Sequence, residues 1–466
     1  MERDLIHALK QWSINKRRKP LVLNGARQVG KTWLLQHFAE TNYETQVYIN
    51  FDNNERAQAI LQNYTDIDGV VKNLETLSGT KINADSTLII FDEIQQCPAA
   101  LTSLKYFCEQ RPELHVATAG SLLGLTVHYG TGFPVGKVNF LNLYPLTFCE
   151  FLTAIGKQNF RELIDTQDYE SMKVFAPDLI SLLKTYFLVG GMPEAVASFA
   201  DDGNFQEVRQ VQNEILNSYV LDISKHAQPN EIGRILQAWR SVPGHLSREN
   251  KKFIFSDISP KARARDYKPS IEWLKQSGMV IEVPRVTKPE IPLSAYNDNV
   301  AFKLFLVDVG LLLAMMDVDV TSVLEGNELF SQFKGALTEQ YVCQQLLSSM
   351  KVTNETKGAP GTEFASKVNP ASNANLASNI KLSNANLTPY YWSNNSSQCE
   401  IDFMVQNKGN VYAIEVKAGT NVKSKSLRVF KQKFENVQAL RFSLLDYKDQ
   451  DWVVNVPLYA IDGFFA

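Results

Sequence analysis

The sequence predicts an α/β fold whose N-terminal part is built on a parallel sheet. Short apolar runs typical of buried strands alternate there with stretches of helical periodicity. The runs cover residues 21–23, 46–51, 87–92 and 115–118. Strands joined through helices form a parallel sheet covered by helices on both faces, and such sheets bind ligands at the carboxyl ends of their strands.

Length and composition favour a soluble protein of several domains. A chain of 466 residues is too long for one ordinary core, so two to four domains are expected. The net charge of −3 excludes a globally basic protein, so any contact with nucleic acid must use a local patch. Five scattered cysteines without a C-x-x-C pair predict reduced thiols in a cytoplasmic protein and no structural zinc. No apolar run approaches the roughly 18 residues of a membrane span, so no membrane contact is expected.

Residues 21–35, LVLNGARQVGKTWLL, carry a motif for gripping phosphates. Gly25, Gly30, Lys31 and Thr32 satisfy G-x-x-x-x-G-K-[ST], the P-loop. The glycines allow a close backbone approach, so that successive N–H groups converge on phosphate oxygens. Lys31 adds a point charge on the β- and γ-phosphates and is expected to act in catalysis. The residues expected to bind the nucleotide are Gly25, Ala26, Arg27, Gln28, Val29, Gly30, Lys31, Thr32, Trp33, Asp92 and Ser121.

Two acids, Asp92 and Glu93, follow an apolar strand. Asp92 would hold Mg²⁺ together with Thr32, and Glu93 would polarise the attacking water as a catalytic residue. An Asp-Glu pair at this point also fits the N-terminal cap of a helix, so both interpretations stay open. At the end of the next strand, Thr118 or Ser121 would either sense the γ-phosphate or only form a turn.

These segments resemble the bacterial and archaeal AAA-superfamily ATPases in which the ATPase core is followed by an uncharacterised C-terminal domain. The matching segments are GARQVGKT, LIIFDEIQQCP, TAGSLLG and NLYPLTFCEF in the core, with YFLVGGMPEAV and KLFLVDVGLL further on. The resemblance covers most of the chain and implies an ATPase related to the signal-transduction branch of the P-loop enzymes. These relatives usually carry Gly-Arg-Val where this chain has Gly136, Lys137 and Val138. The source of any arginine finger therefore stays open.

The chain divides into four expected units. They are an AAA-type ATPase core at residues 1–155, a helical lid at 156–228, a winged-helix-like unit at 229–320, and a nuclease-like unit at 325–466. In the third unit, helical patterns at 232–239 and 267–276 precede two expected strands at 279–283 and 302–307.

The winged-helix-like unit carries a local excess of positive charge. Residues 231–290 hold twelve lysines and arginines against seven acids. Lys261, Arg263 and Arg265, at the entry of an expected helix, are candidate contacts for the phosphates of DNA or RNA. Winged-helix units also serve as packing modules, so a protein partner or a second copy of this chain is the alternative.

The C-terminal unit contains an expected insertion and a constellation of charged residues. Residues 353–388 are rich in asparagine and repeat SNANL twice, which predicts a flexible segment. Glu339 on an expected helix, then Asp402, Glu415 and Lys417 on expected strands, resemble the PD-(D/E)xK nuclease family in their order. The resemblance implies that the acids hold a divalent metal and that the lysine acts near phosphorus. An antiparallel hairpin with a solvated charged face explains the same alternation.

Three functions follow from these observations. The first is an ATP- and Mg²⁺-dependent ATPase that works as a switch, in which nucleotide state alters contacts made by the C-terminal half, with nucleic acid as a candidate target. The second is an ATP-regulated, metal-dependent nuclease. The third is a nucleotide-binding scaffold that scarcely turns over and recruits a protein partner. Glu93 favours hydrolysis over the scaffold, and the charged residues of the C-terminal unit are the support for the nuclease.

Overall fold

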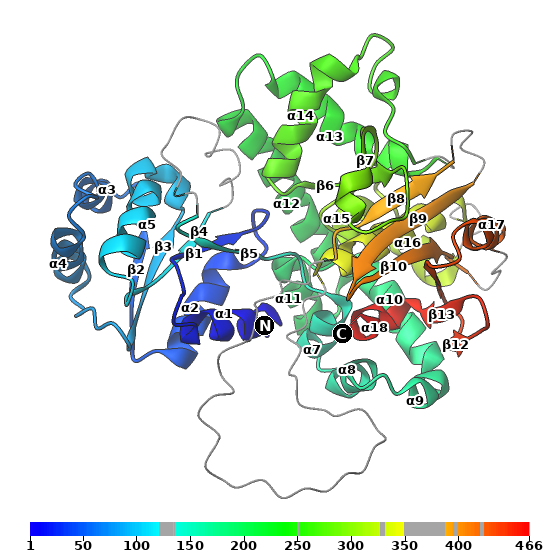
Figure 1. The fold of residues 1–466 in the computed structure, drawn as a ribbon, viewed down its shortest axis with the longest axis horizontal. Coiled ribbons are helices and arrows are strands. Elements are labelled where there is room, and N and C mark those ends of the chain that lie inside the picture. The colour runs from blue at the N-terminus through cyan, green and yellow to red at the C-terminus, as the bar shows by residue number, and fades with distance from the viewer. Residues whose placement is uncertain are drawn as a thin grey trace, which may run out of the picture.

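Two sheets and the helices around them make up the protein (Figure 1). The computed structural model describes residues 1–120, 134, 136–248, 251–326, 331–348, 387–394, 399–419 and 424–465. Nearly all of the expected insertion at 353–388 lies outside these residues. Among the described helices, none is long and apolar enough to span a membrane.

The N-terminal sheet has five strands in the order β2-β3-β4-β1-β5, and every pair in it is parallel. The strands are β1 (Leu21–Asn24), β2 (Thr45–Asn50), β3 (Thr87–Asp92), β4 (His115–Ala119) and β5 (Asn139–Asn142). The predicted parallel sheet is confirmed. Because all five strands run the same way, the ends of β1, β3 and β4 meet at one edge.

Helices cover both faces of this sheet because its strands are apolar on both sides. Leu21 packs with α1 and α2, whereas Val22 points to the other face and packs with α4 and α5. The helices of this part are α1 (Leu5–Ile14), α2 (Lys31–Asn42), α3 (Glu55–Leu61), α4 (Ile67–Ser78), α5 (Pro98–Gln110) and α7 (Phe148–Ala154). Consecutive strand residues thus anchor two separate apolar clusters.

Residues 156–228, the expected lid, form helices joined by short turns. They are α8 (Gln158–Asp165), α9 (Tyr169–Val174), α10 (Ala176–Val189), α11 (Pro193–Asp202) and α12 (Phe205–His226). Two further helices follow, α13 (Ile232–Leu246) and α14 (Ala264–Gln276), as the periodicity at 232–239 and 267–276 predicts. The helical content is as expected, and the role as a lid stays a prediction.

The second sheet has eight strands in the order β12-β13-β11-β10-β9-β8-β6-β7. The strands are β6 (Val280–Val286), β7 (Asn297–Leu306), β8 (Tyr390–Ser393), β9 (Glu400–Asn407), β10 (Asn410–Val416), β11 (Gln438–Ser443), β12 (Lys448–Asp449) and β13 (Val454–Pro457). The remaining helices are α15 (Val309–Met315), α16 (Ser331–Ser348), α17 (Lys425–Lys433) and α18 (Ile461–Phe464).

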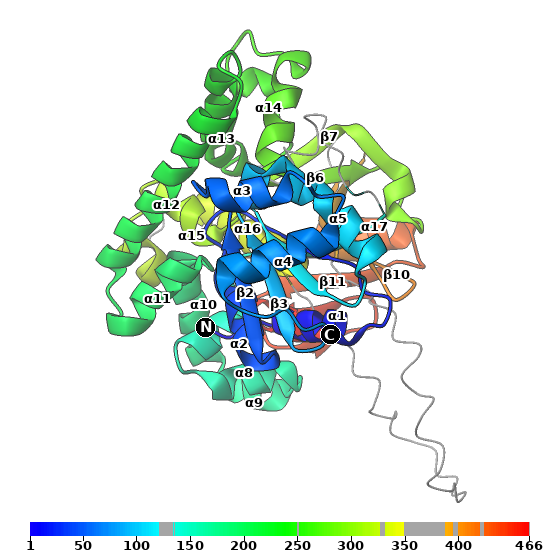
Figure 2. The ribbon, with the colours of Figure 1, turned by 90° about the vertical axis from the view of Figure 1, so that its left-hand side faces the viewer.

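One continuous sheet therefore runs through the two units that the sequence separates near residue 320. The antiparallel pair β6 and β7 matches the strands expected of the winged helix, but β6 also pairs with β8 through Arg285 and Tyr391. The division into a winged-helix-like unit and a nuclease-like unit stays a prediction. Seen from the side of the N-terminal sheet, this second sheet lies behind it (Figure 2).

A shared apolar core joins the N-terminal part to the C-terminal half. The cluster that begins at Leu5 in α1 continues without a break to Ile461 in α18. Polar contacts reinforce it, since Asp462 accepts the backbone N–H of Cys149 at 3.4 Å and the Tyr341 hydroxyl donates to the Leu458 carbonyl at 3.1 Å. The C-terminal helix α18 thus packs against α7 and α8 (Figure 1).

Candidate functional site

The loop between β1 and α2 has the backbone that its two glycines allow. Gly25 has φ 155°, and a Cβ there would lie 2.3 Å from the carbonyl oxygen of Leu143. Gly30 has φ 91° and stands immediately before the first residue of α2. Both positions thus exclude a side chain, for reasons of space at Gly25 and of backbone conformation at Gly30.

The ammonium group of Lys31 points into this loop. It donates to the carbonyl oxygens of Gly25 at 2.9 Å and Ala26 at 2.7 Å, and the side chain is buried. Burial lowers the pKa of Lys31 to about 8, while the nearby carboxylates of Glu93 and Asp92 act in the opposite direction. A cation held by two neutral carbonyls would gain by exchanging them for phosphate oxygens.

Asp92, at the end of β3, ties three elements together. Its Oδ2 accepts hydrogen bonds from the Thr32 hydroxyl at 2.9 Å and the Tyr48 hydroxyl at 2.7 Å, and its Oδ1 accepts the backbone N–H of Glu93 at 3.0 Å. Burial, and then the hydrogen bond to Asp92, raises the pKa of Tyr48 to about 12. Thr32 and Asp92 are thus brought together as the sequence predicts for a magnesium site.

Glu93 opens a short 3₁₀ turn, Ile94–Gln96, in a left-handed conformation with φ 49°. Its side chain makes no capping hydrogen bond to this turn, so the structure does not support the helix-cap interpretation. One carboxylate oxygen instead accepts a hydrogen bond from the Gln95 amide. Glu93 therefore lies beside the P-loop lysine and Asp92 with a carboxylate available to orient water.

Thr118 lies near the end of β4, paired in register with Val22 of the P-loop strand. Its hydroxyl is buried and has no hydrogen-bond partner among the described residues. Ser121, the other expected sensor, lies outside the described residues. Lys137, which stands where the resembled ATPases carry arginine, pairs with Glu109 at 2.9 Å.

The outer side of the P-loop is held by α12. Asp222 forms an ion pair with Arg27, and the Tyr219 hydroxyl donates to the Arg27 carbonyl at 3.0 Å. The Ser218 hydroxyl donates to the side-chain oxygen of Gln28 at 3.2 Å. These contacts link the P-loop directly to the end of the expected lid.

The N-terminal segment holds the other end of the loop. Arg3 donates to the carbonyl of Val29 at 3.0 Å and pairs with the buried Glu150 at 3.1 Å. Trp33, in the first turn of α2, is 42% exposed and stacks on His37 with ring centroids 4.8 Å apart. Arg27, Gln28 and Val29 are thus held by protein contacts, while Trp33 presents an aromatic face to solvent.

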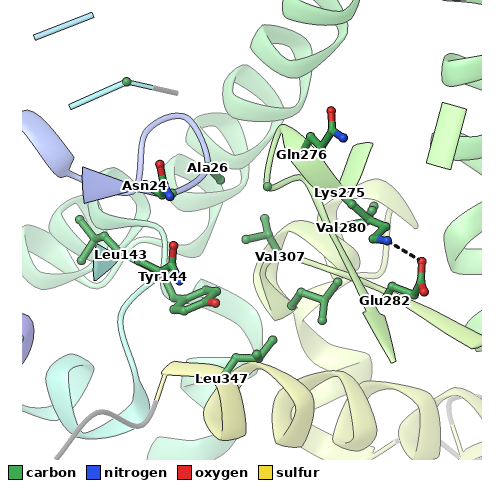
Figure 3. A pocket seen from close by; sticks show the side chains of 15 residues that line it. Asn24, Ala26, Leu143, Tyr144, Lys275, Gln276, Val280, Glu282, Val307 and Leu347 are labelled. Carbon is green, nitrogen blue, oxygen red and sulfur yellow. Dashed lines mark ion pairs between the residues drawn. The ribbon is translucent and has the colours of Figure 1, made fainter. Parts of the chain in front are cut away.

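A cavity of about 350 Å³ separates the P-loop from the turn between α14 and β6. Figure 3 shows Asn24 and Ala26 on one side and Gln276 and Lys275 on the other. The two parts also touch at the cavity lining, since a Cβ at Gly278 would lie 3.0 Å from the Ala26 nitrogen. The C-terminal half therefore contacts the P-loop directly.

Residues 17–152 match the family model described as an AAA domain. This part of the chain is therefore similar to AAA domains, and its parallel five-stranded sheet is consistent with a P-loop NTPase core. Residues 180–322 and 374–460 match two domains of unknown function, DUF8612 and DUF4143. Among curated proteins the comparison finds no match.

Several solved structures are similar at low identity. The Walker-type ATPase PABY2304 of Pyrococcus abyssi is 14% identical, with 67% of this chain and 94% of that chain covered and a TM-score of 0.42. Cdc6p from Pyrobaculum aerophilum is 12% identical, with 69% and 92% covered and a TM-score of 0.25. Drosophila ORC bound to DNA is 14% identical, with 67% and 85% covered and a TM-score of 0.26. These TM-scores are too low for the structures to bear on the arrangement of this chain.

In the C-terminal half, the acid expected on a helix is paired with lysines. Glu339 lies on α16, and its two oxygens contact Lys251 and, at 3.5 Å, Lys303. Lys303 also lies 2.6 Å from Glu400 of β9. We call these four residues, Lys251, Lys303, Glu339 and Glu400, the charged cluster. Within the described parts of the chain, no group of three His, Cys, Asp or Glu side chains could hold a metal ion.

The three strand residues of the expected nuclease site lie on β9 and just at the end of β10. Asp402 accepts the backbone N–H of Val416 at 2.8 Å, and Glu415 pairs with Lys417 at 2.7 Å. Burial, and then the charge of Glu339, raises the pKa of Asp402 to about 7. The antiparallel hairpin of the alternative interpretation is present in β9 and β10, but Glu415 is only 6% exposed, so its charged face is not fully solvated.

Sequence reasoning missed several residues that build these sites. Tyr48 lies in the strand expected at 46–51. This strand pairs with the strand that ends in Asp92, and that pairing is the signal from which the contact of Tyr48 with Asp92 could have been predicted. No local motif marks Asp222 or Arg3, because each acts through a partner far away in the chain. Their partners lie 195 and 147 residues away, respectively.

Proposed function

We propose that this chain is an ATP-binding, Mg²⁺-dependent ATPase that acts as a nucleotide-controlled switch on nucleic acid. The observation that carries the proposal is the meeting of Lys31, Thr32 and Asp92 at the carboxyl edge of the parallel sheet. Glu93 lies beside them with no capping role. Binding, charge neutralisation and water activation are the three tasks that these side chains would divide.

The residues present fit a magnesium nucleotide. The loop leaves no room for a Cβ at Gly25, its lysine is aimed inward, and the buried Thr118 hydroxyl has no hydrogen-bond partner among the described residues. Thr32 and Asp92 would hold Mg²⁺, which neutralises charge on the β- and γ-phosphates when bound. The backbone N–H groups of the loop would bind phosphate oxygens, and Glu93 would accept a proton from the attacking water.

The contacts of the P-loop offer a route from the nucleotide to the rest of the chain. Lys31 has to release the carbonyl of Ala26 when it turns to a phosphate, and Ala26 lies against Gly278 in the turn between α14 and β6. On the other side, the carbonyl and side chain of Arg27 are held by α12. Any shift of the loop on binding ATP would therefore act on α12 and on the turn after α14.

A basic surface at the far end of α14 supports nucleic acid as the target. Lys261, Arg263, Arg265 and Lys268 are exposed around the start of this helix. Arg265 and Lys268 line a hollow of about 460 Å³. We call these four residues the α14 patch. Phosphate contacts from such a patch position a nucleic acid without reading its sequence.

Fluorescence anisotropy of a labelled DNA duplex, measured without nucleotide, with ADP and with a slowly hydrolysed ATP analogue, tests the switch. We expect the dissociation constant to differ severalfold between the ADP and ATP-analogue states. A variant with Lys261, Arg263 and Lys268 all changed to Glu should lose binding in every state. A control with Lys10, Lys72 and Lys173 changed to Glu has the same net charge and should behave as wild type.

Equal affinity in all three nucleotide states, with no effect of the α14 patch variant, would remove nucleic acid as the target. Retained ATP hydrolysis in the same preparation would then show that the ATPase part of the proposal survives without this partner.

A further inference from the structure

We infer that the ammonium group of Lys303 stands in the place of a divalent cation between Glu339 and Glu400. Of the three acids that resemble a nuclease metal site, Glu339 is thus neutralised by a lysine of the chain itself, which it shares with Glu400. The inference goes beyond the proposed ATPase, because it concerns a separate site in the C-terminal half.

The position of Lys303 supports this. Its side chain projects from β7 and is fully buried, and its Nζ lies 2.6 Å from Glu400 Oε1 and 3.5 Å from Glu339 Oε2. The Tyr391 ring, 5.1 Å away, adds an aromatic face to the enclosure. The ammonium therefore bridges a helix acid and a strand acid, as a metal would.

A second lysine occupies the remaining oxygen of Glu339. Lys251 contacts Glu339 Oε1, and its side chain is only 12% exposed. The segment that carries Lys251 is fixed to β7 through the backbone. Lys252 and Lys303 form an isolated antiparallel β-bridge, and the Phe253 N–H donates to the Phe302 carbonyl at 2.8 Å. Both oxygens of Glu339 thus lie beside lysines of the chain itself, and Oε2, with no hydrogen-bond partner among the described residues, makes only the longer contact of 3.5 Å.

The ammonium group of Lys303 and a divalent cation cannot both lie between these carboxylates, because their charges repel each other. A buried ammonium keeps its charge only when carboxylates face it, and here Glu339 and Glu400 do so. A divalent cation among the same carboxylates would lie beside that ammonium and be repelled by it in a medium of low polarity. Glu415, on the neighbouring strand β10, pairs with Lys417 instead.

The charged cluster also joins parts that the sequence separates. Its lysines come from residues 229–320 and its acids from residues 325–466. The cluster therefore fastens the β6–β7 pair and the preceding loop to α16 and β9. We assign it the role of an internal, metal-independent tie in the place where a nuclease would hold its metal.

Mn²⁺ binding to the full-length chain tests this, followed by electron paramagnetic resonance and by isothermal titration. The test uses an Asp92→Asn background without nucleotide, which removes the expected metal ligand beside the P-loop. With Lys303 intact we expect no tight Mn²⁺ site. Lys303→Met should then bind Mn²⁺ at one site per chain, at least about tenfold more tightly than before, because Glu339 and Glu400 lose the ammonium group that lies between them. Lys303→Arg keeps a cation at this position, so this variant should again bind no Mn²⁺ tightly.

Controls separate a true site from unfolding. Adding Glu400→Gln to Lys303→Met removes both members of a buried pair, so the fold should be kept and the new Mn²⁺ site lost. Circular dichroism melting checks each variant. A tight Mn²⁺ site in the Asp92→Asn chain with Lys303 intact, erased by Asp402→Asn, would overturn the inference. So would a folded Lys303→Met chain that gains no site.

Discussion

The hydroxyl of Thr32 donates a hydrogen bond to Oδ2 of Asp92 across 2.9 Å. The two residues are 60 positions apart in the chain and lie on the P-loop helix α2 and on strand β3, respectively. Their contact brings together the two side chains that we propose as magnesium ligands. On that proposal little rearrangement would be needed when a metal nucleotide binds, which would favour tight binding.

Asp92→Asn should uncouple ATP binding from magnesium. The amide keeps the shape of the side chain but loses the charge that a hard cation requires, so affinity for ATP with Mg²⁺ should fall by about tenfold or more. Titration with a fluorescent ATP analogue, with and without EDTA, measures the effect. Tyr48→Phe is the matched control, because it removes a hydrogen bond to the same oxygen and keeps the carboxylate. Equal losses in both variants would argue for a structural role of Asp92.

Gly278→Ala should disturb the contact between the P-loop and the C-terminal half. Its φ of 76° and the approach of a new Cβ to Ala26 at 3.0 Å both oppose a side chain. Gly203→Ala is the control, since Gly203 has φ 71° but open space around it. Both variants should lose about 1 kcal/mol of stability from the backbone conformation alone. Only Gly278→Ala should also weaken ATP binding, and an equal response of the two would leave the contact without a role.

Acid should destabilise the ATPase core through His115. Burial lowers the pKa of His115 to about 4, and its ring pairs with the Tyr43 hydroxyl at 2.5 Å. An unfolded chain binds a proton at His115 near pH 6.5 and the folded chain does not, so stability is complete above that pH and falls toward pH 4.

After allowance for solvent screening, the loss between pH 7 and pH 5 should be on the order of 1 kcal/mol. Urea unfolding at several pH values measures it, and His115→Gln should flatten that part of the profile. The exposed His7 provides the control, since His7→Gln should leave the slope unchanged. A wild-type profile that is flat from pH 7 to pH 5 would contradict the assignment.

The local part of the site could be predicted from the sequence because one motif contains it. The spacing of the motif residues defines the loop, because all of them lie within eight positions: Gly25, Gly30, Lys31 and Thr32. The parallel sheet follows from the alternation of strands and helices. Contacts made across the fold were not visible in this way. The ion pair between Arg3 and Glu150 depends on two segments that only meet after the core has formed.

The C-terminal half shows the same limit more strongly. Alternation correctly predicts that Asp402 and Glu415 lie on strands, but it cannot show whether a helix covers them or what neutralises them. Lys303 lies in an apolar segment, and its role emerges only because β7, α16 and β9 converge. The pairing of β6 with β8 likewise joins strands that are far apart in the chain.

The most direct test of the central claim is single-turnover phosphate release with Mg²⁺ and ATP, measured together with nucleotide binding in three proteins. Wild type should bind ATP and release phosphate. Glu93→Gln should bind ATP normally but release phosphate at least roughly 10² times more slowly, which is the scale expected for loss of a positioned base. Lys31→Ala should bind no nucleotide, because it lacks the phosphate clamp. Unchanged phosphate release by Glu93→Gln, or normal binding by Lys31→Ala, would contradict an ATPase built on these residues.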